Sequence, residues 1–408
     1  MSIFKSHKVS ACDLLDFIPD ELMSRLAEST EVDYYAKVLQ GKKLFNLLLY
    51  GILESERLSQ RTLVDIFNDP FFKTLFNLDI AETVSRSSIS ERLSKISPDY
   101  FRQIFDHIYE KFSEYYLENE RHRYNIIRVD STIISDTSGK ITDGMDYGSV
   151  GNKIVKYGVA FDGVLPCCFD IFTAQSYASE DKTLPAIVRS HIKQERGHRN
   201  IYVMDRGLQS ARNMSDFSSD NIAFIARIKE NRKYVELESL LTEQSLTEFD
   251  ELTLLKDSKV HLYTGKPVTS KSGNIHRKQE LVEQPLRLIV ARNKQNAKYW
   301  FITNDFELPA SEVCRYYKRR WDIEVFFRFI KQELNTKHLI SLNQNGIQVV
   351  LYMILIVAML LLIYKRANNI GYKTAKRRFK MEIRNMIIAM IVVYCGGDPT
   401  LFFKYKKE

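Results

Sequence analysis

Apolar residues recur every three to four positions through residues 1–120, which is the period of an amphipathic α-helix. The repeat is clearest in residues 42–58 and 98–117, where Gly and Pro are rare. This spacing places the apolar side chains on one face of each helix, where they can pack against a neighbouring helix. Residues 1–120 are therefore predicted to form a helical domain.

A short helix is predicted within this domain, beginning at Ser88. Ser88 and Glu91 stand three residues apart in the pattern of a capping box, and apolar residues follow on one helical face. Together with the apolar segment 71–78, this helix is suited to be the recognition helix of a helix-turn-helix. The domain carries fourteen basic residues against twenty acidic ones, so a plain helical bundle fits the sequence equally well.

The pattern changes at Asn125, where β-prone runs begin. The predicted elements are strands at 125–130, 153–161 and 164–172, a helix at 180–192 and a strand at 200–205. A turn at Asp162 and Gly163 joins the second and third strands. Three strands, a helix, a further strand and a later helix form the order of an RNase H-like α/β fold.

A long segment separates residue 205 from the next strong helical pattern, and it exceeds an ordinary connection in such a fold. It contains β-prone runs at 260–263, 286–291 and 299–303, with turn-like residues at 272–274 and 293–296. The fold class is therefore predicted as an RNase H-like α/β core interrupted by a β-rich insertion.

One helix is predicted over residues 311–334, which contain neither Gly nor Pro. Its apolar residues lie on one stripe, roughly 60° wide, that should face a core. A second stripe of similar width carries Tyr317, Arg320, Glu324 and Lys331, so that a carboxylate lies between cations. These residues form either a solvated charged face or a surface against which a phosphate backbone can lie.

Residues 349–363 are apolar without interruption. A membrane span needs about 20 residues, so a buried core helix is predicted, with a membrane anchor as the alternative. Residues 365–408 hold eleven Lys and Arg residues against three acidic ones, and include a second apolar stretch at 386–394. A dimer contact and a DNA-contacting tail both fit this region.

The net charge of +8 is concentrated in that tail and in residues 256–298, which hold ten basic residues against three acidic ones. Two such cationic segments suit a polyanion, so nucleic acid is the expected partner and an acidic membrane surface the competing one. The five cysteines form no CxxC pair and the histidines no HExxH motif, which argues against zinc and a disulfide framework. With no signal peptide pattern at the start, a cytoplasmic location is expected.

Two aspartates, Asp130 and Asp205, stand at the ends of predicted strands, where open α/β sheets place their ligand sites. Either one alone also fits a helix cap or a sugar ligand. Together with Glu324 they can hold two divalent ions about 3.5–4 Å apart, and Mg²⁺ suits such oxygen ligands. Asp136 is the nearest alternative to Asp130, because it would share the same face if the strand continued.

The order Tyr317-x2-Arg320-x3-Glu324-x6-Lys331 resembles the YREK signature of DDE transposases, the group that includes the insertion-sequence-four family. This resemblance implies that Asp130, Asp205 and Glu324 are catalytic and bind two Mg²⁺ ions, with Mn²⁺ as a substitute. It implies DNA contacts for Tyr317, Arg320 and Lys331. A phosphate contact fits Arg206, although a structural ion pair would use this residue equally well.

Trp300 lies in the predicted insertion region. The resemblance implies that it stacks on a base flipped out of the duplex, and packing within a strand is the alternative. Asn304 closes the same strand, with a turn-forming role expected.

The same resemblance implies a cut-and-paste reaction, in which a cleaved DNA strand forms a hairpin that is reopened before insertion into target DNA. The expected partners are double-stranded DNA at the terminal inverted repeats, target DNA and a second copy of the chain, and no membrane. The implied domains are a DNA-end-binding helical domain (1–120), a core (121–228 and 299–365), a β-rich insertion (229–298) and a basic C-terminal region (366–408). A transposase-derived DNA-binding protein without catalysis is the alternative.

Overall fold

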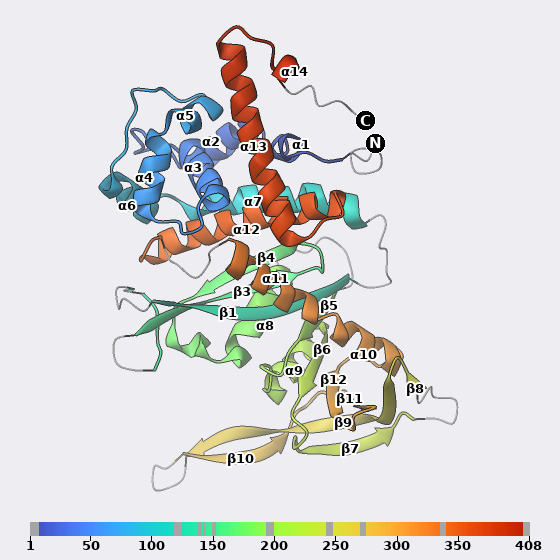
Figure 1. Cartoon of the computed structure of the whole chain (residues 1–408). Helices are drawn as coiled ribbons and strands as arrows, with labels where there is room; N and C mark the ends of the chain where they lie inside the picture. Colours follow the sequence, from blue (N-terminus) through green and yellow to red (C-terminus); the bar gives the residue numbers. More distant parts are fainter. Residues whose placement is uncertain are drawn as a thin grey trace. The chain divides into compact units, whose positions relative to one another are not determined.

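A computed structural model describes residues 8–117, 125–136, 141, 143–148, 152–192, 200–241, 248–269, 275–334 and 340–402. The chain divides into two compact units. Unit 1 comprises Met1–Glu120, Ile134–Val155 and Phe327–Glu408, and unit 2 comprises Arg121–Ile133 and Lys156–Phe326. Figure 1 labels the helices and strands of both units.

Helices from both ends of the chain make up most of unit 1. They are α1 (Ala11–Leu15), α2 (Asp20–Ser29), α3 (Gly41–Glu54), α4 (Gln60–Asn68), α5 (Pro70–Leu75), α6 (Arg86–Lys95), α7 (Pro98–Leu117), α12 (Gln344–Ala367), α13 (Tyr372–Tyr394) and α14 (Pro399–Phe402). The helical character predicted for residues 1–120 is confirmed in the described part of that segment, and α7 has the predicted bounds.

Helix α6 begins one turn before the predicted start. Its N-cap is Ser85, whose side chain accepts a hydrogen bond from the backbone of Ser88, and the Ser88 side chain accepts one from the backbone of Ser85. The prediction that Ser88 caps the helix was therefore wrong, because an earlier Ser pair forms the capping box. Arg92 points inward and donates hydrogen bonds to the carbonyls of Leu39 and Val32.

Helix α12 is the core helix of unit 1. It is the one helix among the described residues that is long and apolar enough to cross a membrane, and 94% of its most apolar window is buried. It packs against α7, α13, α3 and α6 of the same unit, and Figure 1 shows it running alongside α7. The prediction of a buried core helix is confirmed.

Helix α13 uses part of its basic cluster to hold unit 1 together. Lys380 and Arg384 bind the carboxylate of Glu54 at 2.8 and 2.5 Å, and Lys376 donates a hydrogen bond to the carbonyl of Glu333. Three other cations of this helix are exposed: Lys373, Arg377 and Arg378. These three remain available to an external anion.

A mixed β-sheet provides most of unit 2, and its residues 134–136, 145–146 and 153–155 belong to unit 1. Its strands run in the order β10-β9-β11-β12-β6-β5-β1-β3-β2, and β4, β7 and β8 pair with β3, β9 and β9 respectively. The strands are β1 (Asn125–Asp136), β2 (Met145–Asp146), β3 (Lys153–Phe161), β4 (Pro166–Phe172), β5 (Asn200–Met204), β6 (Ala223–Ile228), β7 (Tyr234–Ser239), β8 (Glu248–Phe249), β9 (Leu252–Thr269), β10 (Ile275–Leu281), β11 (Leu286–Asn293) and β12 (Lys298–Thr303). Strands β1, β5 and β6 are parallel neighbours.

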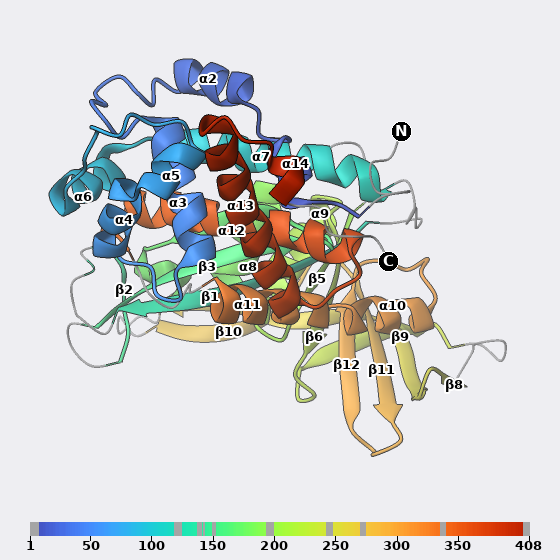
Figure 2. The same cartoon turned by 45° about the horizontal axis from the view of Figure 1, so that its top comes forward.

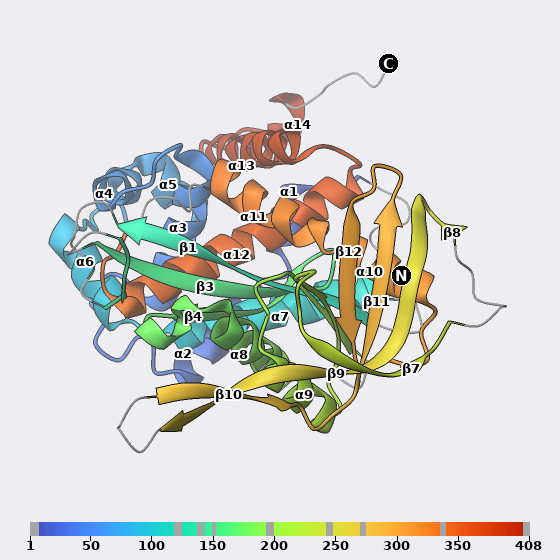
Figure 3. The same cartoon turned by 90° about the horizontal axis from the view of Figure 1, so that it is seen from below.

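The inserted strands extend this sheet. β12 pairs antiparallel with β6, β11 pairs with β12, and β9 pairs with β11 and with β10. Figure 3 shows β9 and β10 side by side. The predicted turn at 293–296 is confirmed by a hydrogen bond from the Asn296 amide to the Asn293 carbonyl at 3.0 Å. The turn predicted at 272–274 lies outside the described residues.

Helices cover both faces of the sheet, because alternate residues of each strand point to opposite sides. Ile201 and Val203 of β5 pack in one cluster with residues of α10 (Ala310–Lys318). Tyr202 points the other way and contacts His191 of α8 (Glu180–Ile192), and α9 (Ala211–Ser219) packs against β6 on that face through Phe217. The predicted helix 180–192 is confirmed.

Candidate active site

Asp130 and Asp205 emerge at the same edge of the sheet. The parallel pairing of β1 with β5 ends at Val129 opposite Met204, so each aspartate follows the last paired residue of its strand. β1 does not end at Asp130 as predicted but continues to Asp136, and its other neighbour in the sheet is β3. The carboxyl ends of parallel strands are the usual place for a ligand site.

The electrostatic environment of Asp130 disfavours its charged form. Burial, followed by the charge of nearby Asp205, raises the pKa of Asp130 to about 7. The opposing contributions are smaller and include a hydrogen bond from the Ser131 amide at 2.7 Å and the cation of Arg320. A perturbed carboxyl beside a second carboxylate is typical of catalytic and cation-binding sites.

Asp205 is held by a tight turn. Its Oδ1 accepts a hydrogen bond from the Gly207 amide at 2.6 Å. A Cβ atom at position 207 would lie 2.8 Å from this oxygen and 2.8 Å from Cβ and Cγ of Glu180. Glycine is therefore required here by the close approach of two acidic side chains.

The predicted single helix 311–334 is broken into α10 and α11 (Trp321–Glu333), which follow each other in Figure 2. Arg319 and Arg320 form the turn between them. In spite of the break, the Arg320 guanidinium lies 3.8 Å from the Asp130 carboxylate and forms an ion pair with Glu324. Glu324 therefore lies on the same side of the site as Asp130, and Arg320 connects the two.

Tyr317 completes this group from the end of α10. Its ring lies 5.8 Å from the Arg320 guanidinium carbon and packs on Phe301 at 5.0 Å. Burial raises the pKa of the Tyr317 phenol, and Arg320 opposes the rise. The Nε atom of Arg320 is buried and has no hydrogen-bond partner among the described residues. Such a donor is suited to an anionic ligand that is not part of the protein.

A fourth carboxylate, Glu180, lies at this edge and was missed by the sequence analysis. It accepts hydrogen bonds from Ser131 Oγ at 2.9 and 3.0 Å and from Lys156 Nζ at 2.9 Å. Lys156 is 4% exposed and also donates to the carbonyl of Ala178. In the sequence, Glu180 is recognisable only as the first residue of a predicted helix. That position does not indicate where the helix packs on the sheet.

A family model described as "Transposase DDE domain" matches residues 121–360, which is more than half of the chain. The chain belongs to the DDE transposase family. Its matched region includes both strand-end aspartates, Arg320 and Glu324.

Named relatives agree with this family. "Putative transposase y4zB" of Sinorhizobium fredii is 35% identical over 86 residues, which span 21% of this chain and 24% of that protein. "Putative transposase for insertion sequence element IS4SA" of Synechocystis is 24% identical over 327 residues, which span 79% of this chain and 82% of that protein. The solved structure titled "Cryo-EM structure of piggyBac transposase synaptic complex with hairpin DNA" shows 10% identity and a TM-score of 0.46, over 100% of this chain and 84% of that one.

The acidic edge of this DDE domain offers oxygen ligands of the kind that Mg²⁺ and Mn²⁺ prefer. The fit is one of chemistry: a cation would relieve the repulsion between Asp130 and Asp205 that helps to raise the pKa of Asp130. Among the described residues, no three acidic, His or Cys side chains are gathered around a single ion position. Arg320 supplies the positive charge between Asp130 and Glu324 in this conformation.

Trp300 lies at the same sheet edge as Asp205. It is paired with Ile228 of β6, which lies beyond the residues of that strand that pair with β5. Its ring meets Tyr234 edge-to-face at 6.0 Å, and its Nε1 atom has no hydrogen-bond partner in the described part of the chain. Packing within the sheet therefore accounts for the ring, while the indole N–H is not used.

Two further predicted contacts are Arg206 and Lys331. Arg206 is exposed in the loop that follows β5, next to Asp205. Lys331 lies on α11 about two turns beyond Glu324, in the part of the helix that belongs to unit 1.

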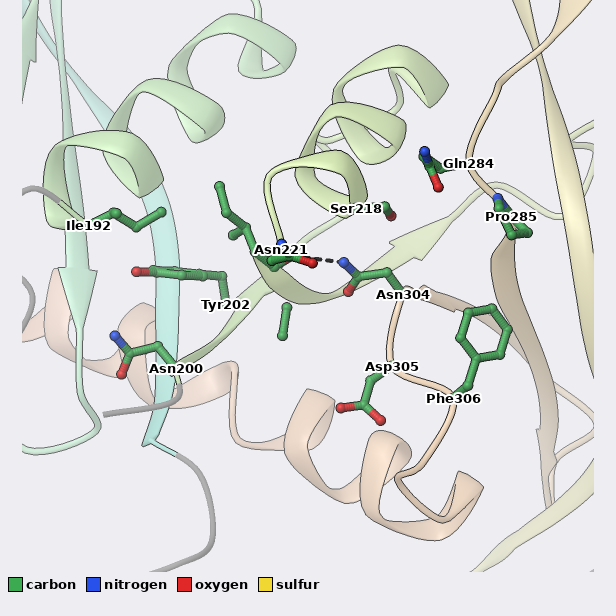
Figure 4. Close-up of a pocket in the computed structure, with 12 residues that line it drawn as sticks. Ile192, Asn200, Tyr202, Ser218, Asn221, Gln284, Pro285, Asn304, Asp305 and Phe306 are labelled. Atoms are coloured by element: carbon green, nitrogen blue, oxygen red, sulfur yellow. Dashed lines mark hydrogen bonds between the residues drawn. The ribbon is translucent and has the colours of Figure 1, made fainter. Parts of the chain in front are cut away.

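A cavity of about 470 Å³ lies at the opposite end of β5 and β6, where Asn200 and Ala223 begin these strands (Figure 4). Asn304 borders it, accepts a hydrogen bond from the Phe224 amide at 3.0 Å and donates one to the Ile222 carbonyl at 2.9 Å. The Asn304 side chain thus links the end of β12 to the start of β6, while the turn that follows is closed by Asp305, whose Oδ1 accepts hydrogen bonds from the Glu307 and Leu308 amides. None of the described residues that line the cavity is cationic.

Proposed function

We propose that this protein is a metal-dependent DNA transposase of the insertion-sequence-four type, which cleaves and rejoins DNA at the ends of a mobile element. One observation carries the proposal. Asp130 and Asp205 lie at one sheet edge, and Arg320 links Asp130 to Glu324 from the turn between α10 and α11, more than a hundred residues away in the chain. The Tyr-Arg-Glu-Lys order of that helix supports the subtype.

Asp130, Asp205 and Glu324 are proposed to hold two Mg²⁺ ions, for which Mn²⁺ can substitute. Two such metal ions, when bound, activate the attacking oxygen and stabilise the leaving oxygen of a phosphodiester. The chain itself contributes position and charge. Gly207 fixes the orientation of the Asp205 carboxylate, and the Arg320 guanidinium supplies the positive charge that a phosphate would meet beside Asp130.

The DNA strand is proposed to contact Tyr317, Arg320 and Lys331 along α10 and α11, with Arg206 beside the second aspartate. Trp300 is proposed to stack on a base turned out of the duplex, because it is only partly buried and lies at the same sheet edge as Asp205, and each stacked base contributes about 1–3 kcal/mol. The reaction proposed for these groups is nicking, hairpin formation and insertion into target DNA by a cut-and-paste route.

The partners proposed are the terminal inverted repeats, target DNA and a second copy of the chain, in the cytoplasm. Exposed Lys373, Arg377 and Arg378 on α13 supply part of the cationic surface. In the basic segment 256–298 the cationic surface is smaller than the sequence count indicates. Arg287 is buried in an ion pair with Asp257 at 2.7 Å.

The decisive test compares wild type with Asp130→Ala, Asp205→Ala and Glu324→Ala on a duplex that carries an element end. Each variant should lose DNA cleavage in Mg²⁺, because each carboxylate is needed to hold the two metal ions. Its affinity for the duplex should stay within about twofold of the wild-type affinity. Asp216→Ala, at an exposed position on α9, is the matched control and should cleave normally. Near wild-type cleavage by any of the three variants removes that residue from the site. Tight binding without cleavage by the wild type would instead favour a DNA-binding protein that has lost catalysis.

A further inference from the structure

The Arg128 side chain joins three separate parts of unit 2. It lies on β1 two residues before Asp130 and is 5% exposed. Its guanidinium donates hydrogen bonds to the carbonyl of Arg319 at 3.2 Å, to the carbonyl of Asp162 at 2.7 Å and to its own strand at Ile126 at 2.6 Å. A further N–H binds the carboxylate of Asp322 at 3.0 Å.

These contacts are concentrated on the break between α10 and α11. The last carbonyls of a helix have no partner within the helix and carry its negative dipole end. Arg319 is the C-cap residue of α10, and Arg128 supplies both a donor and a positive charge to it. Asp322 is an acidic residue in the first turn of α11. Arg128 therefore binds a backbone carbonyl on one side of the break and a carboxylate on the other.

We infer that Arg128 is a positioning residue, which fixes β1 against the α10–α11 break and thereby sets the spacing between Asp130 and the pair Arg320–Glu324. Arg320 directly follows Arg319, whose carbonyl Arg128 holds. A shift of the break would therefore carry both Arg320 and Glu324 away from Asp130. The inference rests on the proposed function, because that function gives the spacing its purpose.

The space for the guanidinium is formed by the turn between β3 and β4. Gly163 adopts φ +104°, and a Cβ atom there would lie 2.6 Å from Nη1 of Arg128. Asp162 closes the turn by accepting hydrogen bonds from the amides of Val164 and Leu165, each at 2.7 Å. A lysine cannot reproduce the contacts, because its ammonium is a point charge and these acceptors are spread around a planar fork.

Unit 2 contains a second buried arginine that serves as a matched control. Arg287 is also 5% exposed, forms two hydrogen bonds to Asp257 at 2.8 and 2.7 Å, and donates to the carbonyls of Asp305 and Leu308. It lies on β11, which is separated from β1 by β12, β6 and β5 in the sheet. Arg287→Lys therefore breaks a similar set of contacts, but four strands away from the strand that carries Asp130.

The experiment compares full-length Arg128→Lys and Arg287→Lys by two measurements: hydrogen exchange of the backbone amides around the α10–α11 break, and Mn²⁺ binding by calorimetry without DNA. We expect Arg128→Lys to speed exchange at the break and to weaken Mn²⁺ binding, each by about tenfold or more, which corresponds to about 1.4 kcal/mol. Arg287→Lys should change neither. Equal exchange rates at the break in the two variants overturn the inference, since Arg128 would then form a buried ion pair that does not position the break.

Two further comparisons separate this inference from the proposed function. If wild type and Asp130→Ala bind Mn²⁺ equally, the proposed metal site is wrong, whereas the exchange measurement still decides the role of Arg128. If Arg128→Lys does not fold, Gly163→Ala tests the same contact, because it crowds the guanidinium without removing it. Gly163→Ala should then speed exchange at the break, and unchanged exchange there refutes the inference.

Discussion

Replacing Asp130 by Asn should stabilise the metal-free protein at neutral pH and much less at acidic pH. Burial and the charge of Asp205 raise the pKa of Asp130 from 3.8 to about 7. A carboxyl with a raised pKa stays protonated in the folded chain while the unfolded chain ionises. The free energy of unfolding of the wild type therefore falls as the pH rises from 3.8 towards 7, and it levels off above that pH. The Asp130→Asn variant has no titrating carboxyl at this position and escapes this loss.

The size of the effect follows from the two pKa values. One pKa unit corresponds to about 1.4 kcal/mol, so a difference of about three sets an upper limit of about 4 kcal/mol at pH 7.5. At pH 5 the folded side chain is still protonated and the unfolded one largely ionised, which gives at most about 1.7 kcal/mol. The free energy of unfolding of Asp130→Asn should exceed that of the wild type by roughly 1–3 kcal/mol more at pH 7.5 than at pH 5.

The assay is denaturant unfolding in EDTA at both pH values, with Asp216→Asn as an exposed carboxylate control. An equal gain for Asp130→Asn at both pH values would refute the reasoning, because ionisation of Asp130 would then carry no folding penalty. Added Mg²⁺ should reduce the difference in unfolding free energy between Asp130→Asn and the wild type at neutral pH. A cation that binds the wild-type site stabilises only the folded state of the wild type.

Three other predictions concern DNA and the site. Affinity for element-end DNA should fall steeply with salt, and a flat salt dependence would exclude DNA as the partner. Arg378→Ala should reduce the slope of log K against log salt. Lys380→Ala should mainly lower the stability of the protein, because the Lys380 side chain binds within unit 1. Arg320→Lys should lower hairpin formation on a pre-nicked duplex more than nicking, because a point charge replaces a planar fork, and a wild-type hairpin yield would assign the stripe to a solvated face. Gly207→Ala should slow cleavage about tenfold or more, as the added Cβ would press on Asp205 and Glu180; a normal rate in a nuclease assay would show that this turn can relax.

Local sequence pattern was sufficient for elements whose period and boundaries agree. α7 and α8 have the predicted bounds, and β3 was predicted as found, because apolar period and turn residues act within a few positions. Where two local signals compete, the pattern failed, as at α6, where the Ser85 capping box overrides the one expected at Ser88.

The candidate site was only partly accessible from the sequence. Asp130 and Asp205 were found because they follow short β-prone runs, and parallel pairing then brings them to one edge. Glu180 was not found, because its place beside Ser131 and Lys156 depends on how α8 packs on the sheet. The apolar sequence of β11 and β12 predicted strands, but their addition to the sheet at β6 depends on pairing between distant segments.

The sequence by itself determined the two chemical ingredients of this protein, a set of carboxylates and a helix that carries Tyr317, Arg320, Glu324 and Lys331. Only the tertiary structure decided that this helix is broken at Arg319. Residues 311–334 contain no helix breaker, so nothing local ends α10. Arg128, 191 positions away in the chain, donates a hydrogen bond to the Arg319 carbonyl, which also accepts one from the Asp322 amide at 3.1 Å. A donor supplied by a distant strand has no signature near the helix it interrupts, because hydrogen bonds depend on position in space and not on separation in sequence.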